Sequence, residues 1–510
     1  MRGSDADYQV AVLDIGKTNK KLLIYDSRLR CLNPEAPAAR FDLIERSGLV
    51  CDDMASIYRW ILAGLRRAAA RFRNIRAVSI STHGATIALL GKRRDRIFPG
   101  DGGLVFPIVS YTHDIGEKAE AAFFRDIGMT PEEAQRRTAT ARFGWLINHG
   151  KQIHYLRRTR PGLFRQVTDI LMFPQYIAYL LTGKKGIEPT YIGCHGYLLD
   201  ASGTRYSDIA ARLGVTDKLP PLPASPSWEV LGTVTPRVVT LTGLRPDCLV
   251  TMGVHDSNAA LVPYFARGMR HFVVQDSGTW IVTMSPCARA VFADDELGKE
   301  VFFNWSIYGT PVKTTIFRGG AEFDFFRQRI LADKPRPRGV NEAVLREIVE
   351  KREAFSLPTI ERGSGLFPHC VARLEGVDTI FRDATTAWHV VDLGLAVQGY
   401  QAMVMAAGRG AGAASPPPFY IEGNVGRNNP VYRAVLASLL HPVPVFFGSM
   451  GGAPFGAALL GIAAVEGLRP EALANRFQMK VKRVPRLKVS QQALRDYVKA
   501  FLDRLREAGG

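Results

Sequence analysis

The chain has 510 residues, 46% of them hydrophobic and 22% charged, which is typical of a globular protein too long for one hydrophobic core. Its net charge of +18 comes from short basic runs between acidic residues, without a nucleic-acid-binding signature, so solvated faces that attract anionic substrates are favoured over nucleic-acid binding. No apolar run reaches the roughly 18 residues of a spanning helix and the N-terminus is polar, so we expect a cytoplasmic protein without a membrane segment.

The first half of the chain is predicted to alternate between strands and helices. Residues 8–25 form a predicted hairpin, residues 54–73 have helical periodicity, and residues 75–81 form a short strand. Residues 117–182 are predicted to be mostly helical, and residues 249–253 to be a buried strand. This succession predicts an α/β layer built on a sheet.

The second half begins with another predicted hairpin, at residues 271–284, and continues with a core helix at 393–408. Residues 409–418 are rich in Gly, Ala and Pro and are predicted to be a flexible connector. The remaining predicted elements are a strand at 419–421 followed by a Gly/Asn-rich turn, a Gly-rich turn at 448–456 that opens a helix, and a closing amphipathic helix at 488–507. We therefore predict two domains, residues 1–251 and 252–510.

The two predicted hairpins resemble each other although they lie about half the chain apart. Each combines a strand, a tight turn that contains Asp-x-Gly and Thr, and a second strand; the first turn follows Asp14 and the second follows Asp276. Such turns offer backbone N–H groups and hydroxyls to a phosphate. Two of them, one in each half, predict two lobes that hold one polyphosphate, which is the layout of a phosphotransferase.

The first turn imitates part of a Walker A loop. Gly16-Lys17-Thr18 matches its end, but Ala11, within a strand, stands where the loop needs its first Gly, so we reject a P-loop. Two interpretations remain. One is a plain hairpin turn; the other is a phosphate-binding hairpin in which Asp14 helps to hold Mg²⁺ through water while Thr18 and nearby amides face the phosphates.

A candidate general base follows the strand at 249–253. Asp256 stands beside small residues that begin a helix, and phosphoryl transfer to an alcohol needs a carboxylate that accepts the hydroxyl proton. The alternative is a helix N-cap. In the second hairpin, Ser277, Gly278 and Thr279 are candidates to donate to phosphate oxygens, or else form an ordinary turn.

A candidate nucleotide pocket lies in the last third of the chain. The segment 422–430 follows a strand and precedes a helix; Gly423 permits close approach to a flat ring or ribose, and an Asn side chain can bond an adenine edge. A strand–turn–helix without a ligand has the same pattern. Gly451-Gly452-Ala453, before another helix, is a candidate wall of the same pocket.

Two further motifs each follow a short apolar strand and are candidates to place polar side chains on a sugar. They are Ser81-Thr82-His83-Gly84 and Tyr111-Thr112-His113-Asp114. A structural role for the histidines is the alternative. The six cysteines include no Cys-x-x-Cys pair, and no His pair has zinc-ligand spacing, which favours reduced thiols and disfavours a structural metal site.

Taken in order, these motifs resemble the FGGY carbohydrate kinases of the actin, hexokinase and Hsp70 ATPase superfamily, from about Val10 to Ala464. Leu231-Gly232-Thr233-Val234 and Gly456-Ala457-Ala458 belong to the same resemblance. It implies an α/β fold of two RNase H-like (actin-like ATPase) domains with a central cleft. It also implies an enzyme that uses ATP and Mg²⁺ to phosphorylate a sugar, with domain closure excluding water.

The resemblance also implies roles for individual residues. Asp256 is the implied catalytic base, and Asp14 and Asp256 are the implied metal-binding residues. The implied nucleotide-binding residues are Asp14, Gly16, Thr18, Asn19, Ser277, Gly278, Thr279, Gly423, Asn424, Asn428 and Gly452. The implied sugar-binding residues are Thr82, His83, Asp114, His255 and Asp256.

The segments Ser277–Trp280 and His255–Ser257 look most like the rhamnulokinase and fuculokinase branch, so L-rhamnulose or L-fuculose is the predicted acceptor. D-Xylulose, L-ribulose and a polyol remain alternatives. Lys17 and Asn19 stand where many members carry Thr or Ser, and Lys21 stands where many carry Arg. These departures leave open a second hypothesis, that the protein is a non-catalytic sugar or nucleotide sensor. The expected partner is a small-molecule sugar, with no nucleic acid or membrane, and a homodimer is left open.

Overall fold

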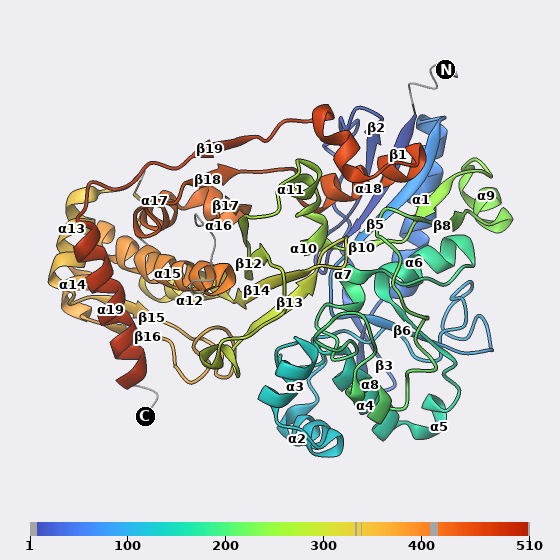
Figure 1. Cartoon of the computed structure of the whole chain (residues 1–510), viewed down its shortest axis with the longest axis horizontal. Coiled ribbons are helices and arrows are strands. Elements are labelled where there is room, and N and C mark those ends of the chain that lie inside the picture. The colour runs from blue at the N-terminus through green and yellow to red at the C-terminus, as the bar shows by residue number, and fades with distance from the viewer. Residues whose placement is uncertain (1–7, 332–333, 338, 409–416, 508–510) are drawn as a thin grey trace.

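The computed structural model describes residues 8–331, 334–337, 339–408 and 417–507. Two central sheets form two lobes, which lie side by side in Figure 1. The first sheet has the order β2 (Lys20–Asp26), β1 (Gln9–Ile15), β5 (Ile75–Thr82), β9 (Leu249–Thr251) and β8 (Val230–Thr233), with β10 (Val254–His255) also pairing with β5. The second has the order β13 (Val301–Trp305), β14 (Pro311–Phe317), β12 (Ile281–Pro286), β11 (Val273–Ser277), β17 (Phe419–Glu422), β18 (Val445–Gly448) and β19 (Val481–Arg483).

Three two-stranded sheets and the helices surround these layers. The small sheets pair β3 (Leu43–Arg46) with β4 (Leu49–Asp52), β6 (Ile87–Leu90) with β7 (Asp169–Met172), and β15 (Phe355–Leu357) with β16 (Arg373–Glu375). The helices of the first half are α1 (Met54–Arg71), α2 (Gly116–Ile127), α3 (Pro131–Thr138), α4 (His149–Thr159), α5 (Pro161–Phe164), α6 (Phe173–Thr182), α7 (Pro189–Ile192), α8 (Asp208–Arg212) and α9 (Pro236–Thr242). Those of the second half are α10 (Asp256–Ala259), α11 (Val262–Ala266), α12 (Gly319–Ile330), α13 (Glu342–Lys351), α14 (Val377–Phe381), α15 (Ala384–Ala407), α16 (Gly423–Asn428), α17 (Pro430–Leu439), α18 (Gly452–Glu466) and α19 (Gln491–Glu507), with 3-10 turns at Asp294–Glu296 and Pro470–Arg476.

The strand registers confirm the internal repeat. In each lobe the hairpin strand that carries the aspartate pairs antiparallel with the next strand and parallel with a later one. Asp14 is the second-last residue of β1 and lies opposite Lys21 and Ser81, while Asp276 is the second-last residue of β11 and lies opposite Val282 and Glu422. The two aspartates therefore occupy equivalent positions, one in each sheet.

Helix α18 returns from the last part of the chain to the first sheet, beside β1 and β5 (Figure 1). Its apolar residues share a core with β1, β2 and β10. Glycines permit this close packing, because a Cβ on Gly456 would lie 1.8 Å from the carbonyl oxygen of Ala259, and one on Gly461 would lie 2.5 Å from Cγ1 of Val10. The boundary between 251 and 252 stays a prediction; β10 and α18 both pack with the first sheet.

A second contact between the lobes involves β13. Strand β13 of the second sheet packs against α7, and the indole of Trp305 is buried beside two glycines of the first lobe. A Cβ on Gly193 would lie 1.7 Å from Trp305, and one on Gly203 would lie 2.5 Å from it. The side-chain amide of Gln135 donates to the carbonyl of Val301 at 2.6 Å, which fixes β13 against α3.

Several predicted elements are confirmed, and some are corrected. The hairpins, α1 and β5 lie where they were expected. The region 117–182 is interrupted by β7, because its residues pair with β6, and the Gly/Asn-rich segment after β17 is the short helix α16. The predicted connector at 409–418 lies mostly outside the described residues.

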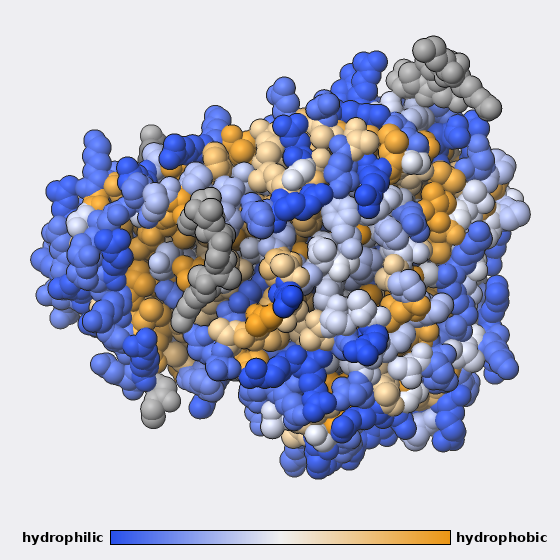
Figure 2. Space-filling view, viewed as in Figure 1, coloured by the Kyte–Doolittle hydropathy of each residue, from blue (hydrophilic) through white to orange (hydrophobic). Residues whose placement is uncertain are grey.

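Helix α15 begins at Ala384, nine residues before the predicted core helix, because Asp383 caps it by accepting the N–H of Thr386 at 2.9 Å. It is long and apolar enough to cross a membrane, but 78% of its most apolar stretch is buried inside the protein, as expected of a core helix. Hydrophilic residues cover most of the molecular face shown in Figure 2.

Candidate active site

A cavity of about 290 Å³ lies between the turn of the second hairpin, α12 and α16. Its lining residues are Gly278, Thr279, Gly320, Phe323, Asp324, Arg336, Asn424, Val425, Asn428 and Asn429. Four of the predicted nucleotide-binding residues, Gly278, Thr279, Asn424 and Asn428, thus surround one space. The lining residues of α12 were not predicted; the Gly319-Gly320 pair is the sequence feature that could have indicated them. Gly320 permits α12 to approach the hairpin, because a Cβ there would lie 2.2 Å from the carbonyl oxygen of Gly278.

The hairpin and α16 are held together beside this cavity. The hydroxyl of Ser277 donates to the carbonyl of Glu422 at 2.5 Å and accepts the N–H of Gly426 at 2.7 Å, so it joins the two segments. Gly423 has φ +85°, and a Cβ there would lie 2.6 Å from Oδ1 of Asp276 and 2.7 Å from the nitrogen of Ser277. Only a residue without a side chain fits this corner.

Three carboxylates from the two hairpins and α10 lie within electrostatic range of one another. Burial, followed by the charge of Asp256, raises the pKa of Asp14 to about 7, while Lys21 opposes the shift. Burial and the same charge raise the pKa of Asp276 to about 6. Burial raises the pKa of Asp256 itself to about 6. Asp14, Asp256 and Asp276 therefore form a cluster of carboxylates whose charges are poorly balanced by the surrounding protein.

Asp256 is held at the point where β10 becomes α10. Its Oδ1 accepts the N–H of Ser257 at 2.7 Å and lies 3.3 Å from Nε2 of His255. Burial lowers the pKa of His255 to about 3, so its ring is neutral. Nδ1 of His255 accepts from the side-chain amide of Asn258 at 2.9 Å, which leaves Nε2 to carry the proton toward Asp256. The side chain of Asp256 is 30% exposed and remains accessible.

Residues of the first lobe also lie close to His255 and Asp256. The N–H of His255 donates to Oγ1 of Thr190 at 3.0 Å, and Thr82 lies beside His255 in the pairing of β5 with β10. His83 follows directly; burial lowers its pKa to about 4, and its ring packs against Tyr111 and Phe173 at centroid distances of 5.9 and 5.3 Å.

Asp114 lies at the surface, where its carboxylate accepts the N–H of Gly116 at 2.8 Å. This local bond stabilises the start of α2. The structure thus gives Asp114 a turn-stabilising position, whereas Thr82 and His83 are buried beside β10. Tyr111, from the same motif as Asp114, packs its ring against His83.

The first hairpin turn is anchored to the first lobe. Nζ of Lys17 donates to both oxygens of Asp52, at 2.8 and 2.9 Å, and to Oγ of Ser110 at 2.8 Å, so its three N–H groups are used. Thr18 and Asn19 are exposed, and Gly16 is half-buried. The partnership with Asp52 was not predicted, because Lys17 lies in the hairpin turn, Asp52 ends β4, and no spacing rule connects them.

Gly452 begins α18, with φ +63°, and is half-buried. Gly452 follows the loop after β18, which also contains Met450. The carboxylate of Glu422 accepts the N–H of Met450. Gly452 is not among the residues that line the 290 Å³ cavity.

Comparisons with known proteins agree with this geometry. Residues 9–263 match the N-terminal domain of the FGGY family of carbohydrate kinases, and residues 269–470 match the C-terminal domain of the FGGY carbohydrate kinases. The chain therefore belongs to the FGGY family of carbohydrate kinases. The predicted family and the predicted two-domain α/β fold are confirmed.

Individual relatives are more distant. A rhamnulokinase from Bacteroides thetaiotaomicron is 29% identical over 241 residues, which are 47% of this chain and 46% of that protein. A probable L-xylulose kinase from Pasteurella multocida is 31% identical over 108 residues, 20% of this chain and 22% of that protein. The chain thus matches about half the length of the rhamnulokinase and a smaller part of the probable L-xylulose kinase.

Two solved structures are similar over nearly the full length. A carbohydrate kinase from Novosphingobium aromaticivorans is 26% identical, with a TM-score of 0.77 over 98% of this chain and 99% of that chain. A xylulose kinase from Rhodospirillum rubrum is 17% identical, with a TM-score of 0.79 over 98% of both chains, and supports the fold alone.

Proposed function

We propose that the protein is an ATP-dependent sugar kinase that transfers the γ-phosphate of ATP to a hydroxyl group of a ketose. The observation that carries the proposal is the cluster of Asp14, Asp256 and Asp276, in which Asp276 precedes the turn that lines the 290 Å³ cavity. The cavity is built from the turn that follows Asp276 and from two asparagines of α16, which suits the adenosine part of a nucleotide. The accessible carboxylate of Asp256 suits a general base.

The donor set of this cluster fits Mg²⁺. Carboxylate oxygens are the ligands that Mg²⁺ prefers, and its usual sites combine one or two carboxylates with waters and substrate phosphates. The raised pKa values of Asp14 and Asp276 are expected of carboxylates arranged for a cation. When bound, Mg²⁺ would neutralise charge that develops on the transferring phosphate. Asp14 and Asp276 are the proposed ligands, together with Asp256 through water.

Other residues of the chain are proposed to position the base and to contact the phosphates. Ser257 and His255 hold Oδ1 of Asp256, which leaves Oδ2 to accept the hydroxyl proton of the acceptor. A pKa of about 6 keeps Asp256 ionised at neutral pH. This pKa is also close enough to the working pH for efficient proton transfer. The N–H of Gly278 donates to the carbonyl of Trp280 at 3.0 Å and so holds the turn in shape. The backbone N–H of Thr279, with the exposed Thr18 on the opposite hairpin, is proposed to face the phosphates.

The acceptor is proposed to be L-rhamnulose or L-fuculose, with D-xylulose, L-ribulose and polyols as alternatives. The similarity to rhamnulokinases favours the first, and the shorter match to probable L-xylulose kinases keeps a pentulose open. The neutral ring of His83 suits an uncharged polyol, because its Nδ1–H donates to the carbonyl of Gly84 at 2.9 Å and leaves Nε2 as a hydrogen-bond acceptor. A cytoplasmic location and a small-molecule partner are part of this proposal.

A screen of ketoses and polyols with purified protein, Mg²⁺ and ATP, coupled to ADP detection, tests the proposal. We expect acceptor-dependent ADP release and a phosphorylated sugar by mass spectrometry with at least one ketose. Tight binding of a sugar without a phosphorylated product would support the sensor hypothesis. Absence of both turnover and nucleotide binding would reject both hypotheses.

A further inference from the structure

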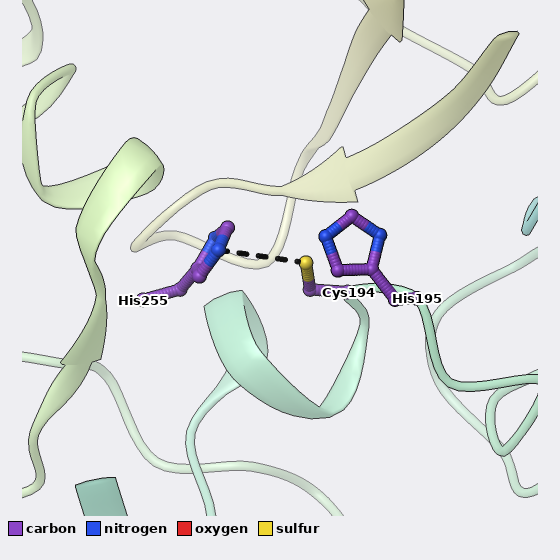
Figure 3. A group of neighbouring side chains, drawn as sticks. All are labelled: Cys194, His195 and His255. Carbon is purple, nitrogen blue, oxygen red and sulfur yellow. Dashed lines mark hydrogen bonds between the residues drawn. The ribbon is translucent and has the colours of Figure 1, made fainter. Parts of the chain in front are cut away.

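Cys194, His195 and His255 meet beside the proposed base, although Cys194 and His195 lie in the loop after α7 and His255 lies in β10 (Figure 3). One potential ligand atom of each residue lies within 4.8 Å of those of the other two. Sγ of Cys194 is 3.8 Å from Nε2 of His255. We propose that this cluster is a zinc-binding site, and that a Zn²⁺ ion bound there inhibits phosphoryl transfer; the inhibition, though not the binding, rests on the proposed function.

The distances suit a four-coordinate ion. A tetrahedral Zn²⁺ site, with Zn–S near 2.3 Å and Zn–N near 2.0 Å, separates its sulfur and nitrogen ligands by roughly 3.6 Å, close to the separation between Cys194 and His255. The sequence did not indicate the site because its ligands come from segments far apart in the chain. Three protein ligands leave a fourth position for water, so the site is open and not a closed structural zinc site.

The histidines are already in the protonation state that a metal needs. Burial lowers the pKa of His195 and of His255 to about 3, so both rings are neutral at physiological pH. Nδ1 of His195 is buried and has no hydrogen-bond partner among the described residues. The thiol of Cys194 is protonated, because burial raises its pKa, and its proton is released to solvent when the thiolate binds the ion.

The surroundings also supply a second-shell partner. A zinc-bound Nε2 of His255 would move the ring proton to Nδ1, which then needs an acceptor. Oδ1 of Asn258 is buried without a partner, and its side-chain amide nitrogen faces Nδ1 at 2.9 Å. A 180° rotation of this amide would present Oδ1 to the new Nδ1–H. Asn258 can therefore hydrogen-bond His255 both without zinc, as a donor, and with zinc, as an acceptor.

Zinc in this position would act on Asp256 directly. Nε2 of His255 lies 3.3 Å from Oδ1 of Asp256, so coordination would remove that N–H from the carboxylate and place a dication next to it. Both changes weaken Asp256 as a base, and the ion would occupy space beside the acceptor. His195 is partly exposed and the side chain of Asp256 is 30% exposed, so solvent reaches both residues.

The test uses the full-length protein, freed of metal with EDTA and titrated with Co²⁺ as a spectroscopic substitute for Zn²⁺. We expect one equivalent of Co²⁺ to give a thiolate-to-cobalt charge-transfer band that Zn²⁺ abolishes. Cys194→Ser should lose the band, and His195→Asn, a residue that tolerates the left-handed backbone of this position, should bind at least on the order of tenfold more weakly. Cys370→Ser, a matched change at another buried thiol, should keep the band.

In the kinase assay with Mg²⁺ and ATP, Cys194→Ser should need at least on the order of tenfold more zinc for half-inhibition than the wild type and Cys370→Ser. A cobalt spectrum of the wild type without a thiolate band, or equal inhibition of all three proteins, would overturn the proposal. If no acceptor is phosphorylated but the thiolate band appears and depends on Cys194, the metal site is supported and the proposed kinase function fails separately.

Discussion

Burial and the charge of Asp256 together raise the pKa of Asp14 to about 7, although Asp14 lies near the end of the first strand of the fold and Asp256 begins a helix more than 200 residues later. Asp276, the counterpart of Asp14 in the second repeat, has its pKa raised by the same two causes. The fold thus brings three acids together, and among the described residues the charge of Lys21 offsets only part of the shift in the pKa of Asp14. This arrangement is unfavourable for the protein alone and favourable for a protein that binds a cation and a nucleotide.

Removing the charge of Asp14 should therefore stabilise the protein when no metal is bound. A carboxyl whose folded pKa lies above its unfolded pKa of 3.8 binds more protons in the folded state, so its contribution to stability falls as pH rises from about 4 to about 7. Asp14→Asn should melt at least roughly 2 °C higher than the wild type at pH 8 in EDTA, and this advantage should vanish near pH 4.

Differential scanning fluorimetry at both pH values measures this difference. The same variant should lose most of the thermal stabilisation that Mg²⁺ and ATP give the wild type. A lower melting temperature for Asp14→Asn at pH 8 would show that the carboxylate makes a net favourable contact in the metal-free protein, contrary to the raised pKa.

The rate of phosphoryl transfer should depend on the ionisation of Asp256. Since the base must be deprotonated and its pKa is about 6, kcat/KM for the sugar should be level above pH 7 and fall by about one log unit per pH unit below the apparent pKa. Bound cation lowers this value, so the midpoint should lie at or below 6. His255, with a pKa of about 3, adds no second transition in this range. A profile that keeps falling with a midpoint above 7 would point to another base.

Gly423→Ala should damage the nucleotide site. The added Cβ would meet Oδ1 of Asp276 at 2.6 Å and the nitrogen of Ser277 at 2.7 Å, in a backbone conformation with φ +85°. Because the hairpin must shift to accept it, we expect ATP affinity to fall by at least on the order of tenfold. Isothermal titration calorimetry with ATP and Mg²⁺ measures the change.

Gly467→Ala is the control for that variant. Gly467 ends α18 with φ +65°, and a Cβ there would meet nothing within 4 Å, so it adds backbone strain without a collision near the nucleotide. Its ATP affinity should equal that of the wild type. Equal losses in both variants would attribute the effect to global destabilisation.

Trp305→Ala should weaken the contact between β13 and the first lobe. The indole is 4% exposed and is packed against the backbone of Gly193 and Gly203, so its loss leaves a cavity. Truncation of a buried Trp costs about 3–5 kcal/mol, which chemical denaturation would detect as a lower midpoint. Trp305→Phe should recover part of the loss. A midpoint unchanged in Trp305→Ala would mean that this contact does not contribute to the folded state.

The sequence predicted the parts of the site that are local. Each hairpin and its turn lie within about 20 consecutive residues. The predicted residues lie in a strand that could be recognised by itself or shortly after one; they are Asp14, Asp256, Gly278, Asn424 and Asn428. Phe323 and Arg336 of the cavity, and the pairing of Lys17 with Asp52, depend on segments that meet only in the folded chain.

Local propensity was also overridden by tertiary contacts. Strand β7 lies within the region 117–182, which was predicted to be mostly helical, and its residues form a strand because β6 offers a partner. The Gly/Asn-rich segment after β17 was predicted to be a turn and forms α16, where the hydroxyl of Ser277 accepts the N–H of Gly426 from outside the helix. Neither partner is adjacent in sequence, so composition alone did not reveal them.

The most direct test of the account is the turnover of Asp256→Asn beside the wild type, with the ketose that the screen identifies. The account predicts that kcat falls by a factor on the order of 10² to 10⁴ while the affinity for ATP and Mg²⁺ changes by only a few-fold, because the base is removed and the nucleotide cavity is left intact. Wild-type turnover in this variant would show that the carboxylate of Asp256 does not accept the proton, and would contradict the central claim.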